Sequence, residues 1–291
     1  MTEPALVSVV VPCFNHERYV EECLRSIAEQ DHPHLELVVI DDASTDATPK
    51  IVENLLRTDE FRSHFTGGVT FRALEENVGA GRALNLGLGL AAGTVLGICN
   101  SDDRYAPERI STLLPLLRDA DLVFSAVRFI DDSGADVTDE DWAAIRLSHT
   151  QRTINAYPSL GFACVPANVA ISTGNLLFKR HLLEQLVGFR DLKYCHDWDF
   201  LLRSILRREP AFSRRFLYDY RLHQANSFRS LGAIADEETR DVLRTYFSAI
   251  RRQDYDNPTA PGPETWPGVF EQMLEVLGFE GHWERALRSP A

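Results

Sequence analysis

Two groups of acidic residues follow short apolar stretches, and their side chains are suited to bind a cation. Asp41 and Asp42 begin the sequence Asp-Asp-Ala-Ser-Thr-Asp, and Asp102 and Asp103 end the sequence Asn-Ser-Asp-Asp. Carboxylates that crowd together repel one another unless a cation or hydrogen-bond donors lie among them. Capping of a following helix is the alternative explanation, and it explains Ser44 and Asp46 better than Asp102 and Asp103.

The chemistry expected at such acids is the binding of a phosphorylated ligand through a divalent cation. Oxygen ligands with open coordination positions suit Mg²⁺ or Mn²⁺. The ion neutralises the negative charge that develops on a departing diphosphate. Because successive residues of an extended chain point in opposite directions, we expect Asp103 to hold the metal and Asp102 to contact the ligand that the metal carries.

The apolar stretches before these acids are typical of buried strands. Strands are predicted at residues 7–14, 35–40, 69–74, 94–99 and 121–130, with helices at 20–28, from 44–48 onward, at 80–91 and at 107–117. This alternation predicts an α/β fold with a doubly wound, mostly parallel sheet. Ligands of such sheets bind beyond the carboxyl ends of the strands, where Asn15 and the four acids lie.

The second half of the chain has a looser pattern. Residues 132–166 are predicted to be rich in loops, with a short helix at 139–147, and to border a second ligand. A strand at 169–178, a helix at 197–207 and a strand at 216–222 follow. Two or three helices come after Ser227, interrupted by the proline-rich segment 257–267. We therefore expect one large domain over residues 1–227 and a helical C-terminal extension over 228–291.

Composition limits the partners of the protein. The 291 residues include 30 Lys and Arg against 43 Asp and Glu, which argues against nucleic acid as a partner. The five cysteines are scattered and fit a reducing compartment. Neither an export signal nor a membrane-spanning stretch is visible, so a cytoplasmic protein is expected. A basic run could form a solvated helix face or contact an anionic lipid-linked ligand or a membrane surface, and the solvated helix face is the favoured interpretation. The run consists of Arg203, Arg207, Arg208, Arg214 and Arg215.

Taken in order, four motifs resemble those of the family 2 glycosyltransferases, which have the GT-A fold. They are Val-Val-Val-Pro-Cys-Phe-Asn at 9–15, Val-Val-Ile-Asp-Asp-Ala-Ser-Thr-Asp at 38–46, Asn-Val-Gly at 77–79 with Arg82 and Asn85, and Asn-Ser-Asp-Asp at 100–103. The resemblance continues more weakly through residues 172–175, 196–199 and 220–223. Ser101 stands at the first position of the Asp-x-Asp motif if that motif is read as residues 101–103.

This resemblance implies an inverting transfer of a sugar from a nucleotide-diphosphate donor to an acceptor hydroxyl, with Mn²⁺ or Mg²⁺ as cofactor. A UDP-sugar is the favoured donor, followed by dTDP-sugars and GDP-sugars. The acceptor would be a glycan, a lipid-linked molecule or a small molecule, in surface-glycan or secondary-metabolite assembly. The resemblance is also compatible with peripheral contact of the protein with the inner face of the membrane. It is equally compatible with a homodimer.

By position, the resemblance also implies roles for individual residues. Asp42 would accept a hydrogen bond from the nucleotide base, Arg82 would lie near the phosphates, and Asp103 would be a metal ligand. The implied donor-binding residues are Pro12, Phe14, Asn15, Asp41, Asp42, Arg82, Asp102 and Asp103. His223 is a second candidate metal ligand, with a purely structural histidine as the alternative.

Asp197 matches the general base of the family. A carboxylate there would take the proton of the acceptor hydroxyl as that oxygen attacks the anomeric carbon from the face opposite the diphosphate. Capping of its own helix is the alternative role. The residues expected at the acceptor, with a β-bulge and core packing as alternatives, are Thr173, Gly174, Asn175 and Trp198.

Two other classes of protein compete with this interpretation. A sugar-nucleotide nucleotidyltransferase would need a basic, glycine-rich loop after the first strand, where this chain has Pro-Cys-Phe-Asn-His. A non-catalytic nucleotide-sugar-binding or scaffold protein would be favoured by loss of Asp103 or Asp197, and both are present. Gly87, Gly89 and Gly93 lie too late in their helix for a dinucleotide fingerprint.

Overall fold

A computed structural model describes residues 5–224, 226 and 232–288, and within these residues eight strands form one sheet. The strands lie in the order β3-β2-β1-β4-β7-β6-β8-β5. Their bounds are β1 Val7–Cys13, β2 Leu35–Asp41, β3 Val69–Ala73, β4 Val95–Ile98, β5 Arg104–Tyr105, β6 Leu122–Ile130, β7 Leu177–Lys179 and β8 Ala211–Arg221. β1 to β4 run parallel to their neighbours among themselves, as do β6 and β8, whereas β7 is antiparallel to β4 and β6. The predicted mostly parallel α/β sheet is confirmed.

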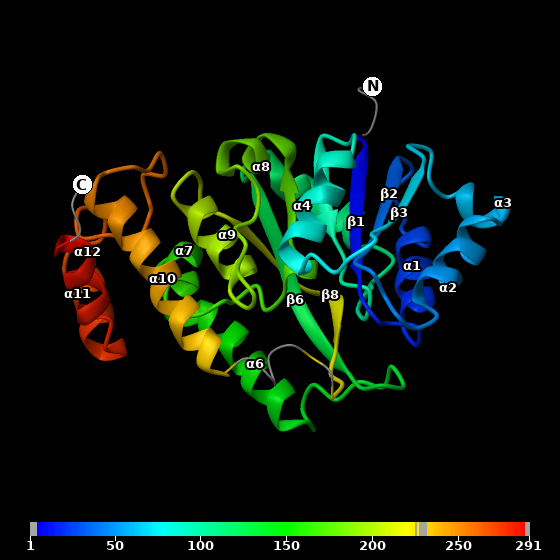
Figure 1. Ribbon diagram of the computed structural model, residues 1–291. Helices are drawn as coiled ribbons and strands as arrows, with labels where there is room; N and C mark the ends of the chain where they lie inside the picture. Colours follow the sequence, from blue (N-terminus) through cyan, green and yellow to red (C-terminus); the bar gives the residue numbers. More distant parts are fainter. Residues whose placement is uncertain (1–4, 225, 227–231, 289–291) are drawn as a thin grey trace.

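Helices cover both faces of this sheet (Figure 1). In chain order they are α1 Val20–Ala28, α2 Thr48–Leu56, α3 Asp59–Arg62, α4 Ala80–Leu90, α5 Arg109–Leu113, α6 Trp142–Arg152, α7 Leu160–Cys164, α8 Arg180–Leu186, α9 His196–Ile205, α10 Gly232–Arg251, α11 Val269–Leu277 and α12 Glu280–Arg288. Short 3₁₀ turns lie at Leu114–Arg118, Thr153–Ala156 and Thr173–Asn175.

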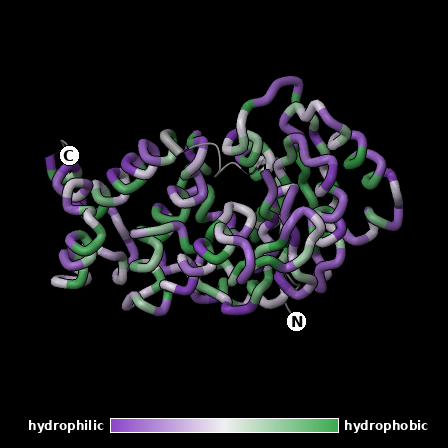
Figure 2. Tube along the Cα trace, turned by 90° about the horizontal axis from the view of Figure 1, so that it is seen from below, coloured by the Kyte–Doolittle hydropathy of each residue, from purple (hydrophilic) through white to green (hydrophobic). Residues whose placement is uncertain are grey.

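The hydrophobic core is divided between the two faces by the alternation of side chains along each strand. Val9 and Val11 of β1 pack in one apolar cluster with α1, while Val10 belongs to a second cluster with Leu84 and Leu88 of α4. Figure 2 shows hydrophobic segments concentrated inside the molecule and hydrophilic segments at its outer loops. The carboxyl ends of β1, β2 and β4 are consequently fixed side by side.

The C-terminal helices are joined to the rest of the molecule by apolar packing. Leu243 and Phe247 of α10 belong to the same buried cluster as Phe200 of α9. α10 runs beside α9 (Figure 1). The predicted boundary between residues 227 and 228 lies outside the described residues, so the division into two domains stays a prediction.

Three predicted elements differ from the structure. The strand expected at 169–178 is a 3₁₀ turn followed by the short β7, because the Ser172 side chain accepts the N–H of Gly174 and closes a turn. The helix expected at 139–147 is α6, which begins at Trp142 because the Asp141 carboxylate accepts the N–H groups of Ala143 and Ala144. β8 begins at Ala211, earlier than expected.

Among the helices described, none has both the length and the apolar character required to cross a lipid bilayer.

Candidate active site

Hydrogen bonds between side chains and backbone join the loops after β1 and β2. Asn15, which has a left-handed backbone with φ 55°, donates its N–H to Ser44 Oγ at 2.9 Å, and its Oδ1 accepts the N–H of Thr45 at 2.8 Å. Phe14, beside it, is 44% exposed although it is aromatic, and Pro12 is half-buried. These contacts hold the two loops together and leave the aromatic ring of Phe14 exposed beside them. A flat base can stack on such a ring.

Asp42 organises the loop that leads into α4. Its two carboxylate oxygens accept the N–H groups of Val78 at 2.7 Å and of Gly79 at 2.9 Å. Asp41 is 1% exposed; its Oδ1 accepts the N–H of Ser44 at 3.0 Å, but within the described residues its buried Oδ2 has no hydrogen-bond partner. A buried acceptor without a partner is costly, so Asp41 Oδ2 is the better candidate for a donor group on a ligand.

Arg82, at the start of α4, is engaged with the loop before α9. Its guanidinium forms an ion pair with Asp191 at 2.6 Å, and about two thirds of both side chains is exposed. Such exposed pairs contribute only about 0–1 kcal/mol to stability. Arg82 can therefore exchange Asp191 for a phosphate at little cost.

Asp102 lies between two histidines from distant parts of the chain. Its Oδ2 is 2.9 Å from Nε2 of His223, which follows β8, and 3.9 Å from Nε2 of His16, which follows β1. His16 is oriented by Ser101, whose Oγ is 2.7 Å from His16 Nδ1. Burial opposes ionisation of Asp102, but His16 and His223 outweigh it and lower the pKa of the carboxyl group. One ligand atom from each of the three residues lies within 4.8 Å of the others.

Asp103 has a different environment from Asp102. Its Oδ1 accepts the N–H of Arg221 at 2.7 Å, and its Oδ2 accepts the Tyr218 hydroxyl and Nδ2 of Asn100. It is 1% exposed, and burial followed by the charge of Asp102 raises the pKa of Asp103 well above its ordinary value. That Asp103 holds the metal stays a prediction, but in this structure Asp102, and not Asp103, lies beside His16 and His223. Residues 100–103 form a turn, closed by a hydrogen bond from Asp103 N–H to the Asn100 carbonyl, instead of an extended strand.

Asp197 is the second residue of α9. Its Oδ1 accepts the N–H of Trp198 at 2.7 Å, and its Oδ2 accepts Nδ2 of Asn168 at 2.8 Å. Burial raises the pKa of Asp197, against the lowering effect of His196. The neighbouring His196 is held by Thr173, whose Oγ1 is 2.9 Å from His196 Nε2. A carboxyl group with a raised pKa is a suitable proton acceptor.

The carboxylates of Asp102 and Asp197 both raise the pKa of the Tyr220 hydroxyl. The pKa of Tyr220, in β8, is raised well above its ordinary value, first by burial and then by the charges of Asp103, Asp102 and Asp197. Hydrogen bonds connect the two acids through residues 172 and 173: Ser172 Oγ accepts Nδ2 of Asn100, in the turn that carries Asp102, at 2.9 Å, and Thr173 Oγ1 lies 2.9 Å from Nε2 of His196, the neighbour of Asp197. The cluster of His16, Asp102 and His223 and the candidate base are therefore joined by a short chain of contacts.

Several residues expected at the acceptor lie inside the protein instead. Trp198 is 7% exposed and donates its indole N–H to the Cys164 carbonyl at 2.7 Å, so it packs in the core. Asn175 is fully buried and hydrogen-bonded to Arg109, Ser125 and Ala170. These contacts favour the core-packing alternative for Trp198 and a structural role for Asn175, and contact of either with an acceptor stays a prediction.

Gly174 and Thr173 have packing roles that explain their residue types. A Cβ atom at Gly174 would overlap the Tyr218 hydroxyl and lie 2.9 Å from the Asn100 nitrogen, so the glycine allows Tyr218 to reach Asp103. Thr173 is 6% exposed and supports His196. Whether Thr173 or Gly174 also contacts an acceptor stays a prediction.

The structure adds residues that sequence reasoning missed. His16 follows the carboxyl end of a predicted strand, as the acids do, so its position in the sequence could have identified it as a site residue. Tyr218 and Arg221 support Asp103 from β8, and Asn168 supports Asp197. These contacts join residues that are 29 to 118 positions apart, and no local pattern announces them.

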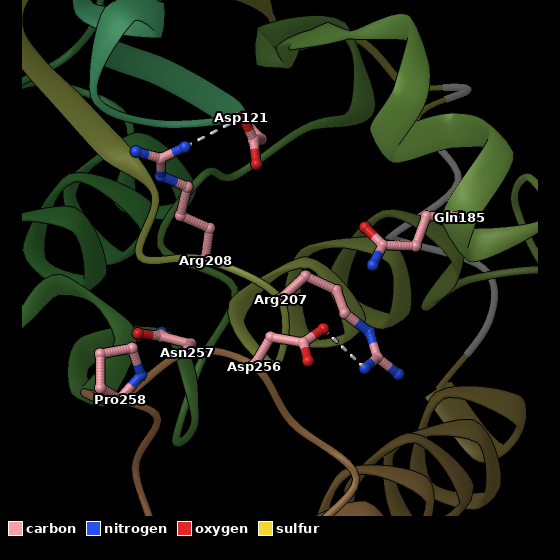
Figure 3. A pocket seen from close by; sticks show the side chains of 7 residues that line it. All are labelled: Asp121, Gln185, Arg207, Arg208, Asp256, Asn257 and Pro258. Atoms are coloured by element: carbon pink, nitrogen blue, oxygen red, sulfur yellow. Dashed lines mark hydrogen bonds and ion pairs between the residues drawn. The ribbon is translucent and has the colours of Figure 1, made fainter.

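A hollow of about 400 Å³ lies at the opposite edge of the sheet, near the start of β6 (Figure 3). It is lined by Asp121, Gln185, Arg207, Arg208, Asp256, Asn257 and Pro258. Its charges neutralise one another, since Arg207 pairs with Asp256 at 3.2 Å and Arg208 with Asp121 at 3.7 Å (Figure 3). Arg203 and Arg215 of the basic run pair with Asp199 and Glu108, and Arg214 and Arg215 lie in β8, so the run does not form the single solvated helix face that was expected.

Comparisons with known proteins agree with this geometry. A family model described as Glycosyl transferase family 2 matches residues 8–186. TuaG of Bacillus subtilis, whose name refers to teichuronic acid biosynthesis, is 35% identical over 120 residues, which are 41% of this chain and 45% of TuaG. The chain thus spans less than half the length of TuaG.

Solved structures share the fold over nearly the whole chain. The structure of Staphylococcus aureus TarS with UDP-GlcNAc has a TM-score of 0.65 and 21% identity, over 97% of this chain and 79% of the TarS chain. The mannosyltransferase PcManGT of Pyrobaculum calidifontis, with GDP-Man and Mn²⁺, has a TM-score of 0.63 and 22% identity, over 98% of this chain and 74% of the other. At these identities the likeness concerns the fold, which is that of GT-A glycosyltransferases.

Proposed function

This chain belongs to glycosyl transferase family 2, and from that membership we propose that it moves a sugar from a nucleotide-diphosphate donor to an acceptor hydroxyl, with inversion at the anomeric carbon. The observation that carries the proposal is the meeting of Asp102, His16 and His223 at the carboxyl edge of the sheet. Asp197, a carboxyl group with a raised pKa, is connected to the turn of Asp102 through the hydrogen bonds of Ser172 and Thr173.

The cluster suits a divalent cation. It offers one carboxylate and two imidazole nitrogens, a mixed donor set that fits Mn²⁺ better than Mg²⁺, which prefers oxygen ligands and retains water. Asp102 and His223 would hold the ion, with His16 as a third ligand. When bound, the ion neutralises the charge that develops on the diphosphate leaving group. Asp103 and Ser101 keep Asp102 and His16 in place.

The donor nucleotide would lie over the loops after β1 and β2. Phe14 offers an exposed ring for the base, and the buried Oδ2 of Asp41 accepts its N–H. Asp42 shapes this pocket by holding the loop before α4, and Arg82 turns from Asp191 to the phosphates. An imide N–H like that of uracil or thymine matches a single buried acceptor, so UDP is the first choice, dTDP the second and GDP the third.

Asp197 would act as the general base. The acceptor oxygen gives its proton to the Asp197 carboxylate and forms a bond to the anomeric carbon, while the bond from that carbon to the diphosphate oxygen breaks. Attack from the face opposite the leaving group inverts the configuration. Asn168 and the Trp198 N–H hold the carboxylate in position, and the partial burial of Asp197 makes it a stronger base than an exposed aspartate.

The acceptor is proposed to be a glycan or a lipid-linked saccharide. This choice is supported by TuaG, whose name refers to teichuronic acid biosynthesis. The similarity to TuaG covers 41% of this chain. A cytoplasmic location, with contact at the inner face of the membrane, fits such an acceptor.

Thermal unfolding tests the proposal directly. The purified protein is heated with UDP, dTDP, GDP or CMP, each with and without Mn²⁺, and the series is repeated on Asp102→Ala and on Asp119→Ala, an exposed acid that serves as the control. A ligand at about a hundred times its dissociation constant adds roughly 2.7 kcal/mol to the unfolding free energy. Stabilisation by one diphosphate only with Mn²⁺, lost in Asp102→Ala and kept in Asp119→Ala, supports the proposal. No shift with any nucleotide overturns it and favours a scaffold protein that retains the fold.

A further inference from the structure

The segment before α9 is held by a side chain from the C-terminal helix α10. Glu238 accepts three consecutive backbone N–H groups: Oε1 accepts that of Lys193 at 2.7 Å, and Oε2 accepts those of Tyr194 at 2.8 Å and Cys195 at 2.9 Å. A carboxylate that binds three successive N–H groups fixes the backbone there, because each charge-assisted bond is stronger than a neutral one. α9 begins at the next residue, His196.

This contact supplies what the start of α9 lacks. Cys195 is the N-cap residue of α9, and its side chain makes no capping hydrogen bond. Asp197 itself accepts the N–H of Trp198 in the first turn, but the N–H of the N-cap residue is bound by Glu238, 43 positions away from Cys195. Asp197 is the second residue of the helix, so the backbone that Glu238 fixes is the backbone that carries Asp197.

A second clamp on the same face of α10 strengthens the connection. Arg190, at the other end of this segment, bonds Asp199 of α9 at 2.9 Å and forms an ion pair with Asp241 of α10. Glu238 and Asp241 are three residues apart and lie on one face of the helix. Their two contacts hold residues 190–195 between α9 and α10.

Glu238 is not needed to attach α10, since Leu243 and Phe247 are already buried in the main core. We propose that Glu238 is a positioning residue for the catalytic base, so that the C-terminal extension takes part in the transfer reaction. This inference rests on the proposed role of Asp197. A displacement of about 1 Å at a catalytic group can cost roughly a hundredfold in rate, so a loosened segment lowers turnover without changing donor binding.

Two variants of one helix test the inference. Glu238→Gln removes the charge and one of the two acceptor oxygens, and Glu237→Gln removes an equal charge from an exposed neighbouring position. Hydrogen–deuterium exchange of the amides of residues 193–195 reports on the segment itself. We expect faster exchange in Glu238→Gln, by about tenfold or more, and no change in Glu237→Gln.

Turnover separates positioning from simple folding. The donor is whichever UDP-, dTDP- or GDP-sugar the wild-type protein hydrolyses with Mn²⁺ and water as acceptor, and nucleotide release is measured for wild type, Glu238→Gln, Asp197→Asn and the double variant. We expect Glu238→Gln to lower kcat about tenfold with an unchanged Kd for the nucleotide, and to have no further effect in the Asp197→Asn background.

Other outcomes are decisive in different ways. Equal losses from Glu238→Gln with and without Asp197, or a wild-type rate in Glu238→Gln, overturn the positioning role. Wild-type activity in Asp197→Asn overturns the base assignment and the positioning role with it, as does the absence of turnover with every donor. In those cases the exchange data still show whether Glu238 holds the segment, so the two failures can be told apart.

Discussion

Nε2 of His223 lies 2.9 Å from Oδ2 of Asp102, which joins the end of the last long strand to the turn after β4. Asp103, the next residue, instead accepts hydrogen bonds from Tyr218, Arg221 and Asn100. The two adjacent carboxylates thus have different partners, two histidines for one and the groups of three other residues for its neighbour. Substitutions at the two positions should fail in different ways.

Asp102→Asn should abolish the Mn²⁺-dependent part of nucleotide binding and leave the unfolding temperature without ligand nearly unchanged. Asp103→Asn should destabilise the protein by about 2–3 kcal/mol, because the amide cannot accept every hydrogen bond that the buried carboxylate accepts. Denaturant unfolding and calorimetric titration of UDP with Mn²⁺ measure the two quantities. The reverse pattern would restore Asp103 as the metal ligand.

His223→Gln and His16→Gln should each weaken Mn²⁺ binding at least about tenfold, as losing one ligand of a three-residue site does. The effect should be larger for His223, whose ring nitrogen is closer to Asp102. Titration of Mn²⁺ in the presence of UDP, followed by the electron paramagnetic resonance of the unbound ion, gives the affinities. His34→Gln, at a half-buried position on the loop before β2, is the control. Equal affinities in all variants would contradict the site.

The transfer rate should fall as pH drops through the raised pKa of Asp197, because the protonated carboxyl group cannot take a proton from the acceptor. The acidic limb of the kcat profile should therefore lie above the ordinary range of an aspartate. In Asp197→Asn this limb should disappear together with most of the rate. A wild-type acidic limb that persists in the variant would mean that another group is the base.

The same carboxyl group makes stability depend on pH with a defined sign. Because the pKa of Asp197 is higher in the folded than in the unfolded protein, the folded protein holds more protons, and the free energy of unfolding decreases as pH rises between the two pKa values. Asp197→Asn removes this decrease in the free energy of unfolding, because the amide does not titrate. The difference in unfolding temperature, variant minus wild type, should become more positive from pH 4 to pH 7, and a difference that does not change with pH would contradict the raised pKa.

Gly174→Ala should cost about 1–3 kcal/mol of stability, since the added methyl group overlaps the Tyr218 hydroxyl. Tyr218 would then move away from Asp103, and binding of Mn²⁺ should weaken as well. Gly89→Ala is the matched control, because nothing lies within 4 Å of a Cβ atom at that helical position. Equal stability of Gly174→Ala and wild type would show that Tyr218 adjusts at no cost.

Arg82→Ala should raise the KM for the donor about tenfold or more, because the guanidinium is the proposed clamp for the diphosphate. The same change should alter the unfolding free energy by less than about 1 kcal/mol, since its ion pair with Asp191 is exposed. Asp191→Asn breaks the same pair but should leave the donor KM unchanged or lower it. A KM that rises equally in both variants would assign Arg82 a structural role.

The sequence predicted the first half of the fold well, because each strand there is a continuous apolar run that ends in polar residues. β1, β2, β4 and β6 lie within one or two residues of their predicted bounds, and Asp41 and Asp42 lie at the sheet edge as expected. Residues 169–178 could not be predicted in the same way. Most of these residues are buried, Gly174 packs against Tyr218, and Asn175 bonds Ser125, so partners from distant segments shape the turn there.

In the candidate site too, features that depend on local sequence were predicted, and features that depend on long-range contacts were not. The carboxylate positions followed from local pattern, but the assignment between Asp102 and Asp103 depended on a turn at residues 100–103 and on His223 from the far end of the sheet. Trp198 resembled a ligand-stacking residue in its motif, and its burial against Cys164 shows that it packs in the core. Long-range packing decided each of these cases.

The contact between Asp102 and His223 spans 121 residues, and this separation orders events during synthesis of the protein. A ribosome that adds about 5–20 residues per second needs roughly 6–24 s to pass from the first residue to the second. Throughout that interval the nascent chain carries the Asp102 carboxylate without its histidine from β8. The cluster of His16, Asp102 and His223 is therefore completed only after the residues beyond β8 have left the ribosome, and a chain interrupted earlier would contain the loops after β1 and β2 without the complete cluster.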